Sequence, residues 1–139
     1  MPLTLTDITP DQDRHLLSAS VHIVSKRSAA LLPEDDRAIL GLLQSDPPSS
    51  LRQMATLLNL NPGTLSRRIT RIHRRLRHPV VASLVTRGHT LSTRFFNIAR
   101  ALFAAGQPAR TIARAFNAED REILAIKRYI EGWSKSASS

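Results

Sequence analysis

The stretch "NLNPGTLSRRITRIHRRLRH", residues 59–78, holds six arginines and two histidines and no acidic residue. Aliphatic residues recur through it at the spacing of one helix face, which predicts an amphipathic helix over residues 63–77. Pro79 ends this helix, because proline disfavours helical backbone at the residue before it. The arginines therefore gather on a helix whose opposite side packs inward. The expected inward residues are Leu65, Ile69, Ile72 and Leu76.

The residues before this helix complete a helix-turn-helix pattern. The sequence "SLRQMATLL", residues 50–58, predicts a short helix that Ser49 or Ser50 would cap. Ala55 is small at the place where the second helix would cross the first. Asn59 occupies a turn position with left-handed backbone, which asparagine tolerates best after glycine. Because a helix-turn-helix lays its second helix in the major groove, the arginine-bearing face is expected to meet DNA.

The expected DNA contacts of this helix fall into two sets. Residues at its N-terminal end are expected to reach base edges, namely Asn61, Ser66, Arg67 and Thr70. Residues expected nearer the phosphates, where they add affinity but little sequence preference, are Arg71, Arg74, Arg75 and Arg77. The alternative is a solvated helix whose arginines serve solubility. Six arginines on one helix repel each other, however, and nothing in the stretch offsets them, which favours a polyanion on this face.

The charge of the whole chain also favours a nucleic acid as partner. The 139 residues carry a formal net charge of +9, and the isoelectric point is about 11.5. Residues 47–118 contain twelve arginines and no aspartate or glutamate, and arginine outnumbers lysine 17 to 3 in the chain. The planar guanidinium fork suits phosphates and guanine edges better than the point charge of lysine. Acidic protein surfaces and membranes are weaker candidates.

Residues 32–77 resemble region 4 of bacterial sigma factors, the domain that reads the promoter −35 element. The resembling features are Leu32-Pro33, Arg37, the block from Ala55 to Leu60, Gly63-Thr64-Leu65, Arg68-Ile69 and the basic residues that follow. The resemblance implies a helical DNA reader, with engagement of RNA polymerase or a sigma partner as an alternative. Residues 1–31 are too short for the region that grips the core polymerase, so an isolated region-4-like reader is expected rather than a complete sigma factor.

A second segment, residues 108–133, repeats the same pattern 58 residues later. It resembles the helix-turn-helix that ends resolvases and many transposases. One interpretation is a second DNA site, and the other is a degenerate copy used for packing or for a homodimer. The acids Glu119, Asp120 and Glu122 stand where phosphates would approach, and they count against DNA. The candidate residues of the second DNA site are Arg110, Arg114, Arg121 and Arg128.

The chain as a whole is expected to be all-α, a tandem helix-turn-helix of six to seven short helices. Its first helix would start at Thr9 as N-cap. The expected divisions are an N-terminal helix (1–31), the first helix-turn-helix (32–78), connecting helices (79–107), the second helix-turn-helix (108–133) and a disordered tail (134–139).

Several classes of function find no support in the sequence. The chain has no cysteine, and no histidine-carboxylate cluster has the spacing of a metal site, so no metal and no cofactor are expected. No run approaches membrane-spanning length, which favours a cytoplasmic, nucleoid-associated protein. Asp35 and Asp36 stand at a helix start and are expected to act as caps rather than as catalysts. The sequence thus predicts a non-enzymatic, sequence-specific regulator that binds double-stranded DNA. A DNA-binding accessory of a recombinase or transposase system is the alternative.

Overall fold

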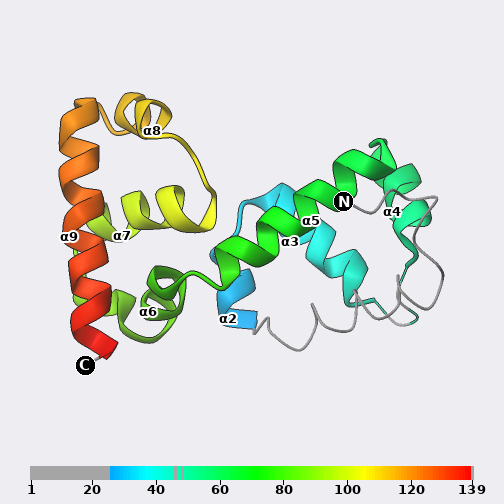
Figure 1. Ribbon diagram of the computed structural model, residues 1–139, viewed down its shortest axis with the longest axis horizontal. Coiled ribbons are helices and arrows are strands. Elements are labelled where there is room, and N and C mark those ends of the chain that lie inside the picture. The colour runs from blue at the N-terminus through cyan, green and yellow to red at the C-terminus, as the bar shows by residue number, and fades with distance from the viewer. Residues whose placement is uncertain (1–25, 46, 48, 139) are drawn as a thin grey trace, which may run out of the picture.

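The computed structural model describes residues 26–45, 47 and 49–138, and every regular element among them is helical. Figure 1 shows two groups of helices, α3 to α5 and α6 to α9, joined where α5 runs into α6. The elements are α2 (Lys26–Ala29), α3 (Glu34–Leu43), α4 (Leu51–Leu58), α5 (Pro62–Leu76), α6 (Pro79–Arg87), the 3-10 turn η1 (Gly88–Thr90), α7 (Thr93–Ala99), the π-helical turn η2 (Arg100–Ala104), α8 (Ala109–Ala115) and α9 (Asp120–Ser138).

The first group owes its helix starts to polar caps that the sequence supplies. Ser50 caps α4 in a reciprocal capping box with Gln53, which satisfies two backbone donors at once. Asn61 caps α5 by accepting the Gly63 N–H at 2.8 Å, and Pro62 takes the first helical position, where no N–H is needed. The expected cap of the short helix and the expected extent of the long one are therefore confirmed.

A tight turn fixes how α4 meets α5. Asn59 adopts left-handed backbone with φ 56°, as expected for the residue that replaces the usual turn glycine. The Leu60 N–H then donates to the carbonyl of Ala55 at 2.9 Å and closes the end of α4. Ala55 is almost fully buried where the two helices approach, so its small side chain permits the crossing.

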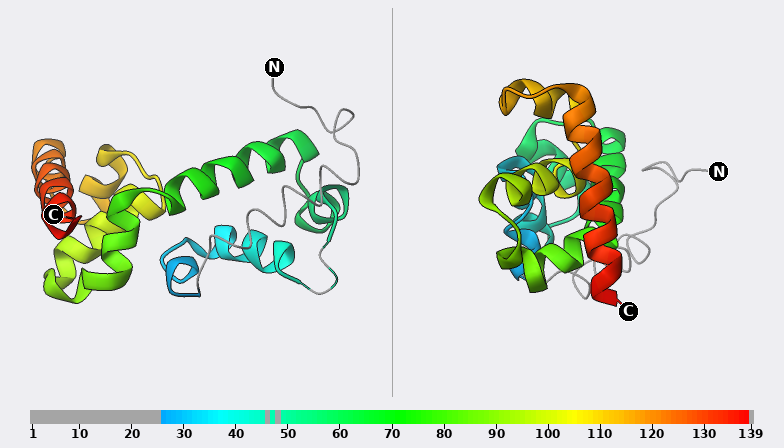
Figure 2. Two further views of the ribbon diagram at one scale, coloured as in Figure 1. Left: turned by 60° about the horizontal axis from the view of Figure 1, so that its bottom comes forward. Right: turned by 90° about the vertical axis from the view of Figure 1, so that its left-hand side faces the viewer.

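The second group consists of α6 to α9, and its buried residues belong to the same hydrophobic cluster as those of the first group. Figure 2 shows α9 running across α6 and α7, while α8 lies at the N-terminal end of α9. Its core is aliphatic, and Gly106, with φ 68°, ends the α7–η2 helix before α8 begins. The buried aliphatic residues include Val80, Val81, Leu84, Ile98, Ile112, Ile123, Ile126 and Ile130. The segment 79–107, expected as connecting helices, is thus half of this group.

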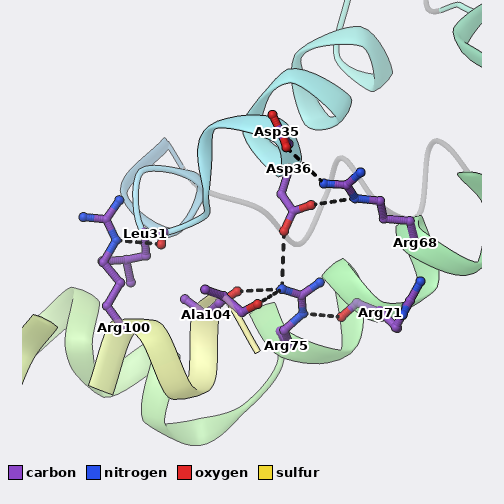
Figure 3. A network of polar contacts seen from close by, with 9 residues as sticks. Leu31, Asp35, Asp36, Arg68, Arg71, Arg75, Arg100 and Ala104 are labelled. Carbon is purple, nitrogen blue, oxygen red and sulfur yellow. Dashed lines mark hydrogen bonds and ion pairs between the residues drawn. The ribbon is translucent and has the colours of Figure 1, made fainter. Parts of the chain in front are cut away.

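Two arginines join the groups (Figure 3). Arg75 of α5 donates to the carbonyls of Ala104 at 3.1 Å and Ala105 at 2.8 Å, at the C-terminal end of η2. Arg100 of η2 donates to the Leu31 carbonyl at 2.9 Å, just after α2. Carbonyls at helix ends lack partners within the helix, and a guanidinium satisfies them while it offsets the negative end of the helix dipole.

The structure corrects one expected division and leaves another outside its range. The tail 134–138 is not disordered, because α9 continues to Ser138 and the buried Ser134 hydroxyl lies 2.9 Å from that of Ser83. Most of the expected N-terminal helix, including its cap Thr9, lies outside the described residues.

Candidate nucleic-acid interface

The α5 helix separates its buried and exposed sides as its sequence predicts. The four expected inward residues, Leu65, Ile69, Ile72 and Leu76, are all buried. The opposite side carries cations and hydroxyls and no acidic residue. The exposed residues of this side are Arg67, Thr70, Arg71, Arg74 and Arg77.

The N-terminal end of α5 holds its polar side chains in a local network. Asn61 is exposed, and its Oδ1 is engaged by the Gly63 N–H, so its amide nitrogen is the group left to offer to a partner. The Arg67 guanidinium donates to Thr64 Oγ1 at 3.3 Å, which holds it near the start of the helix. Thr70 donates its hydroxyl proton to the Ser66 carbonyl at 3.1 Å, and Ser66 itself is half-buried. Three of the four expected base-reading residues thus lie at the N-terminal end of the helix, and Thr70 lies near its middle.

Two arginines of α5 face the protein instead (Figure 3). Asp36 of α3 has a side chain only 4% exposed, and it accepts from Arg68 Nε at 3.0 Å and from Arg75 Nη1 at 3.3 Å. Arg75 Nη1 also donates to the carbonyls of Ala104 and Ala105, and its Nε donates to the Arg71 carbonyl. The expectation that Arg75 lies at a phosphate does not fit this geometry, because its charge is paired with Asp36 and its Nε and Nη1 donate within the protein.

The same contacts change the interpretation of the paired acids. Asp36 was expected to cap α3, yet no side chain caps this helix, and Asp36 anchors α5 to α3. Asp35 remains exposed and lies 3.8 Å from Arg68. A signal for the pair exists in the sequence, since Arg68 and Arg75 are seven residues apart and border the buried stripe rather than oppose it.

The two histidines of the basic stretch take structural positions. His78 begins α6, where its Nδ1 accepts the Val80 N–H at 3.1 Å, and its ring packs against Phe103. His73 is half-buried, and burial lowers its pKa below the usual value, with the nearby Arg77 charge lowering it further. Neither histidine belongs to the outward side of α5.

The second predicted turn has the backbone of the first. The Ala118 N–H donates to the Ala113 carbonyl at 2.8 Å, as Leu60 donates to Ala55 at 2.9 Å in the first turn. Asn117 adopts left-handed backbone with φ 53°. Residues 109–138, which comprise α8 and α9 and are termed here the α8–α9 unit, therefore repeat the helix-turn-helix geometry.

The charged side chains at this second turn are partly paired with each other. Arg121 lies 2.6 Å from Glu119, and Arg94 of α7 lies 3.2 Å from Glu122. Among the other candidate residues of the second site, Arg110, Arg114 and Arg128 are exposed, and no ion pair joins them to any residue that the structure describes. The four candidates thus lie in one unit, but Arg121 is engaged by an acid.

Comparison with known families adds an independent finding. Residues 34–77, about a third of the chain, match the family of AsnC-type helix-turn-helix domains, and the match spans α3, α4 and α5. It confirms the first helix-turn-helix and indicates a DNA-binding regulator. It does not support sigma region 4 or resolvases in particular. No curated protein and no solved structure matches the chain. No helix in the described part of the chain is long and apolar enough to cross a membrane.

Proposed function

We propose that the protein is a transcription regulator that binds double-stranded DNA sequence-specifically and lays α5 in the major groove. One observation carries the proposal: in a helix-turn-helix, the outward side of α5, with its C-cap Arg77, bears four exposed arginines and no acid. The two arginines with acidic partners, Arg68 and Arg75, stand at the border of the buried side. The arginines of the outward side therefore have no acidic partner among the described residues. A polyanion such as DNA would neutralise their charge.

Base reading belongs to the N-terminal end of α5. The Arg67 guanidinium carries the forked donors that match the O6 and N7 acceptors of guanine. Asn61 offers its amide N–H groups, and Thr70 offers a methyl group and an acceptor oxygen. Ser66 is half-buried and is the least accessible of the four.

Phosphate contacts belong to the rest of the outward side. We retain Arg71, Arg74 and Arg77 for this role and withdraw Arg75, whose charge is paired with Asp36 and whose Nη1 donates to the carbonyls of Ala104 and Ala105. Three phosphate contacts correspond to a slope of about −2.7 in a plot of log affinity against log salt.

A binding selection from random duplex DNA, with the purified chain at about 150 mM salt, tests the proposal. We expect an enriched motif, and its length and symmetry separate one reader from tandem readers or a homodimer. Arg67→Gln should lower the preference for that motif by roughly tenfold, since a bidentate base contact contributes about 1–3 kcal/mol of discrimination. Arg71→Gln should lower the affinity for all duplexes by about the same factor, whatever their sequence. Arg27→Gln, which removes an exposed charge from α2, is the matched control.

The proposal fails if no motif is enriched and Arg67→Gln binds DNA as Arg27→Gln does. In that case a protein partner, such as RNA polymerase or a sigma partner, becomes the better explanation of the arginines.

A further inference from the structure

The outward side of α9 carries a line of cations. Arg121, Arg128 and Lys135 follow each other at seven-residue intervals, about two helical turns apart, and all three are exposed. The small residues Ala125 and Gly132 stand between them, and the exposed Leu124 and the acid Glu131 lie beside the line. Because the α8–α9 unit repeats the first helix-turn-helix at an interval of 58 residues, Arg128 and Lys135 occupy the places of Thr70 and Arg77 on the outward side, while Arg121 corresponds to Gly63.

The first helix of the unit adds two further cations. Arg110 and Arg114 are exposed on α8, whose inward residues Ile112 and Ala113 are buried. In the first helix-turn-helix the residue equivalent to Arg110 is Arg52, which is exposed as well. In helix-turn-helix proteins this first helix crosses the DNA backbone, where a cation meets a phosphate.

The acids at the start of α9 do not cancel these cations. Glu119 is paired with Arg121, and Glu122 is paired with Arg94, so each has a partner within the protein. Asp120 is the remaining acid of that turn. After this pairing, four exposed cations of the unit lack an acidic partner among the described residues, namely Arg110, Arg114, Arg128 and Lys135.

Two of the four positions that read bases in the first unit are apolar in the second. The residue equivalent to Arg67 is Ala125, and the residue equivalent to Ser66 is Leu124, whose side chain is exposed. Neither side chain has a hydrogen-bonding group for a base edge. The equivalents of the other two, Asn61 and Thr70, are Glu119, which is paired with Arg121, and Arg128. The unit therefore lacks the forked donor that Arg67 supplies in the first unit. Its exposed cations are its own set, because the equivalents of Arg71 and Arg74 are Tyr129 and Gly132.

We propose that the α8–α9 unit is a second contact surface for duplex DNA, which binds the phosphate backbone without sequence preference. The contacts are made by Arg110, Arg114, Arg128 and Lys135. Each contact displaces counterions and adds about 0.9 to the salt slope, so the four together add about 3.6. This surface does not rest on the role of α5, because its cations lie on other helices.

The test measures the affinity of the full chain for a 40-base-pair duplex of random sequence, about four helical turns long, between 50 and 250 mM salt. Two double variants remove the cations of each helix, Arg110→Gln/Arg114→Gln and Arg128→Gln/Lys135→Gln. A third, Lys26→Gln/Arg27→Gln, removes the same charge from α2 and is the control. Circular dichroism melts establish that each variant is folded.

Each α8–α9 double variant should lower affinity about tenfold at 150 mM salt and flatten the salt slope by about 1.8. The control should stay within about twofold of the parent, since α2 lies outside the surface. The preference for a selected motif over random sequence should not change, because no reader is removed. A change in that preference would overturn the sequence-neutral role.

An α5 variant separates this inference from the proposed function. If Arg67→Gln/Arg71→Gln/Arg74→Gln abolishes binding while the α8–α9 variants behave as the control, the second surface is refuted and the reader helix stands. If the α5 variant keeps its affinity for random duplex and the α8–α9 variants lose theirs, the second surface is supported and the proposed DNA contact of α5 is refuted.

Discussion

Replacing Asp36 with asparagine should destabilise the protein strongly, although the change removes only one charge and almost no volume. The Asp36 side chain is 4% exposed and holds two guanidinium groups, while those of Arg68 and Arg75 are 31% and 20% exposed. An asparagine still accepts one hydrogen bond, but its amide N–H groups then face a guanidinium that can only donate. The two arginines are left next to each other without a counter-charge.

The size of the effect follows from these exposures. Removing one partner of a fully buried ion pair costs about 3–5 kcal/mol. Because the arginines stay partly solvated, we expect a loss at the lower end of this range, about 3 kcal/mol of the free energy of unfolding. For a domain of this size that corresponds to a fall of roughly 12 °C in the melting temperature, at about 4 °C per kcal/mol. Urea unfolding at pH 7, followed by circular dichroism, measures the difference.

Asp35 provides the matched control, since it neighbours Asp36 in sequence and the same replacement can be made. Its side chain is 86% exposed and lies 3.8 Å from Arg68. Such an exposed pair contributes little, so Asp35→Asn should cost less than about 0.5 kcal/mol. Equal urea midpoints for the two variants would refute the reasoning, because they would mean that the buried carboxylate stabilises the α3–α5 contact no more than the exposed one.

Two other predictions concern single positions. Burial lowers the pKa of His73, so the unfolded chain takes up a proton first as the pH falls, and stability should be lost below about pH 6.5. The urea midpoint of the parent should therefore fall more between pH 7.5 and 5.5 than that of His73→Gln, and parallel curves would exclude this contribution. At Asn59, whose φ is 56°, Asn59→Gly should change stability by less than about 0.5 kcal/mol and Asn59→Ala should cost about 1 kcal/mol. Thermal melts of the two variants should rank them in that order.

Local patterns determined most of the secondary structure and the orientation of α5. The spacing of Leu65, Ile69 and Ile72 depends only on the helical repeat, so the buried and outward sides could be assigned before any tertiary contact was known. The turn residue Asn59 was recognisable because left-handed backbone restricts which residues fit. These features are set by neighbours within a few positions along the chain.

The partners of the charged side chains depended on the tertiary structure alone. Arg68 and Arg75 meet Asp36 across 32 and 39 residues of sequence, and only the crossing of α3 and α5 brings them together. The place of Arg75 beside the buried stripe is visible in the sequence, but its partner Asp36 follows only from the tertiary contact. The packing of residues 79–107 against α9 likewise follows from which helices cover each other. The sequence by itself therefore determined where this protein carries its positive charge, and the fold decided which of those charges remain available to DNA, because ion pairing depends on distance in space rather than along the chain.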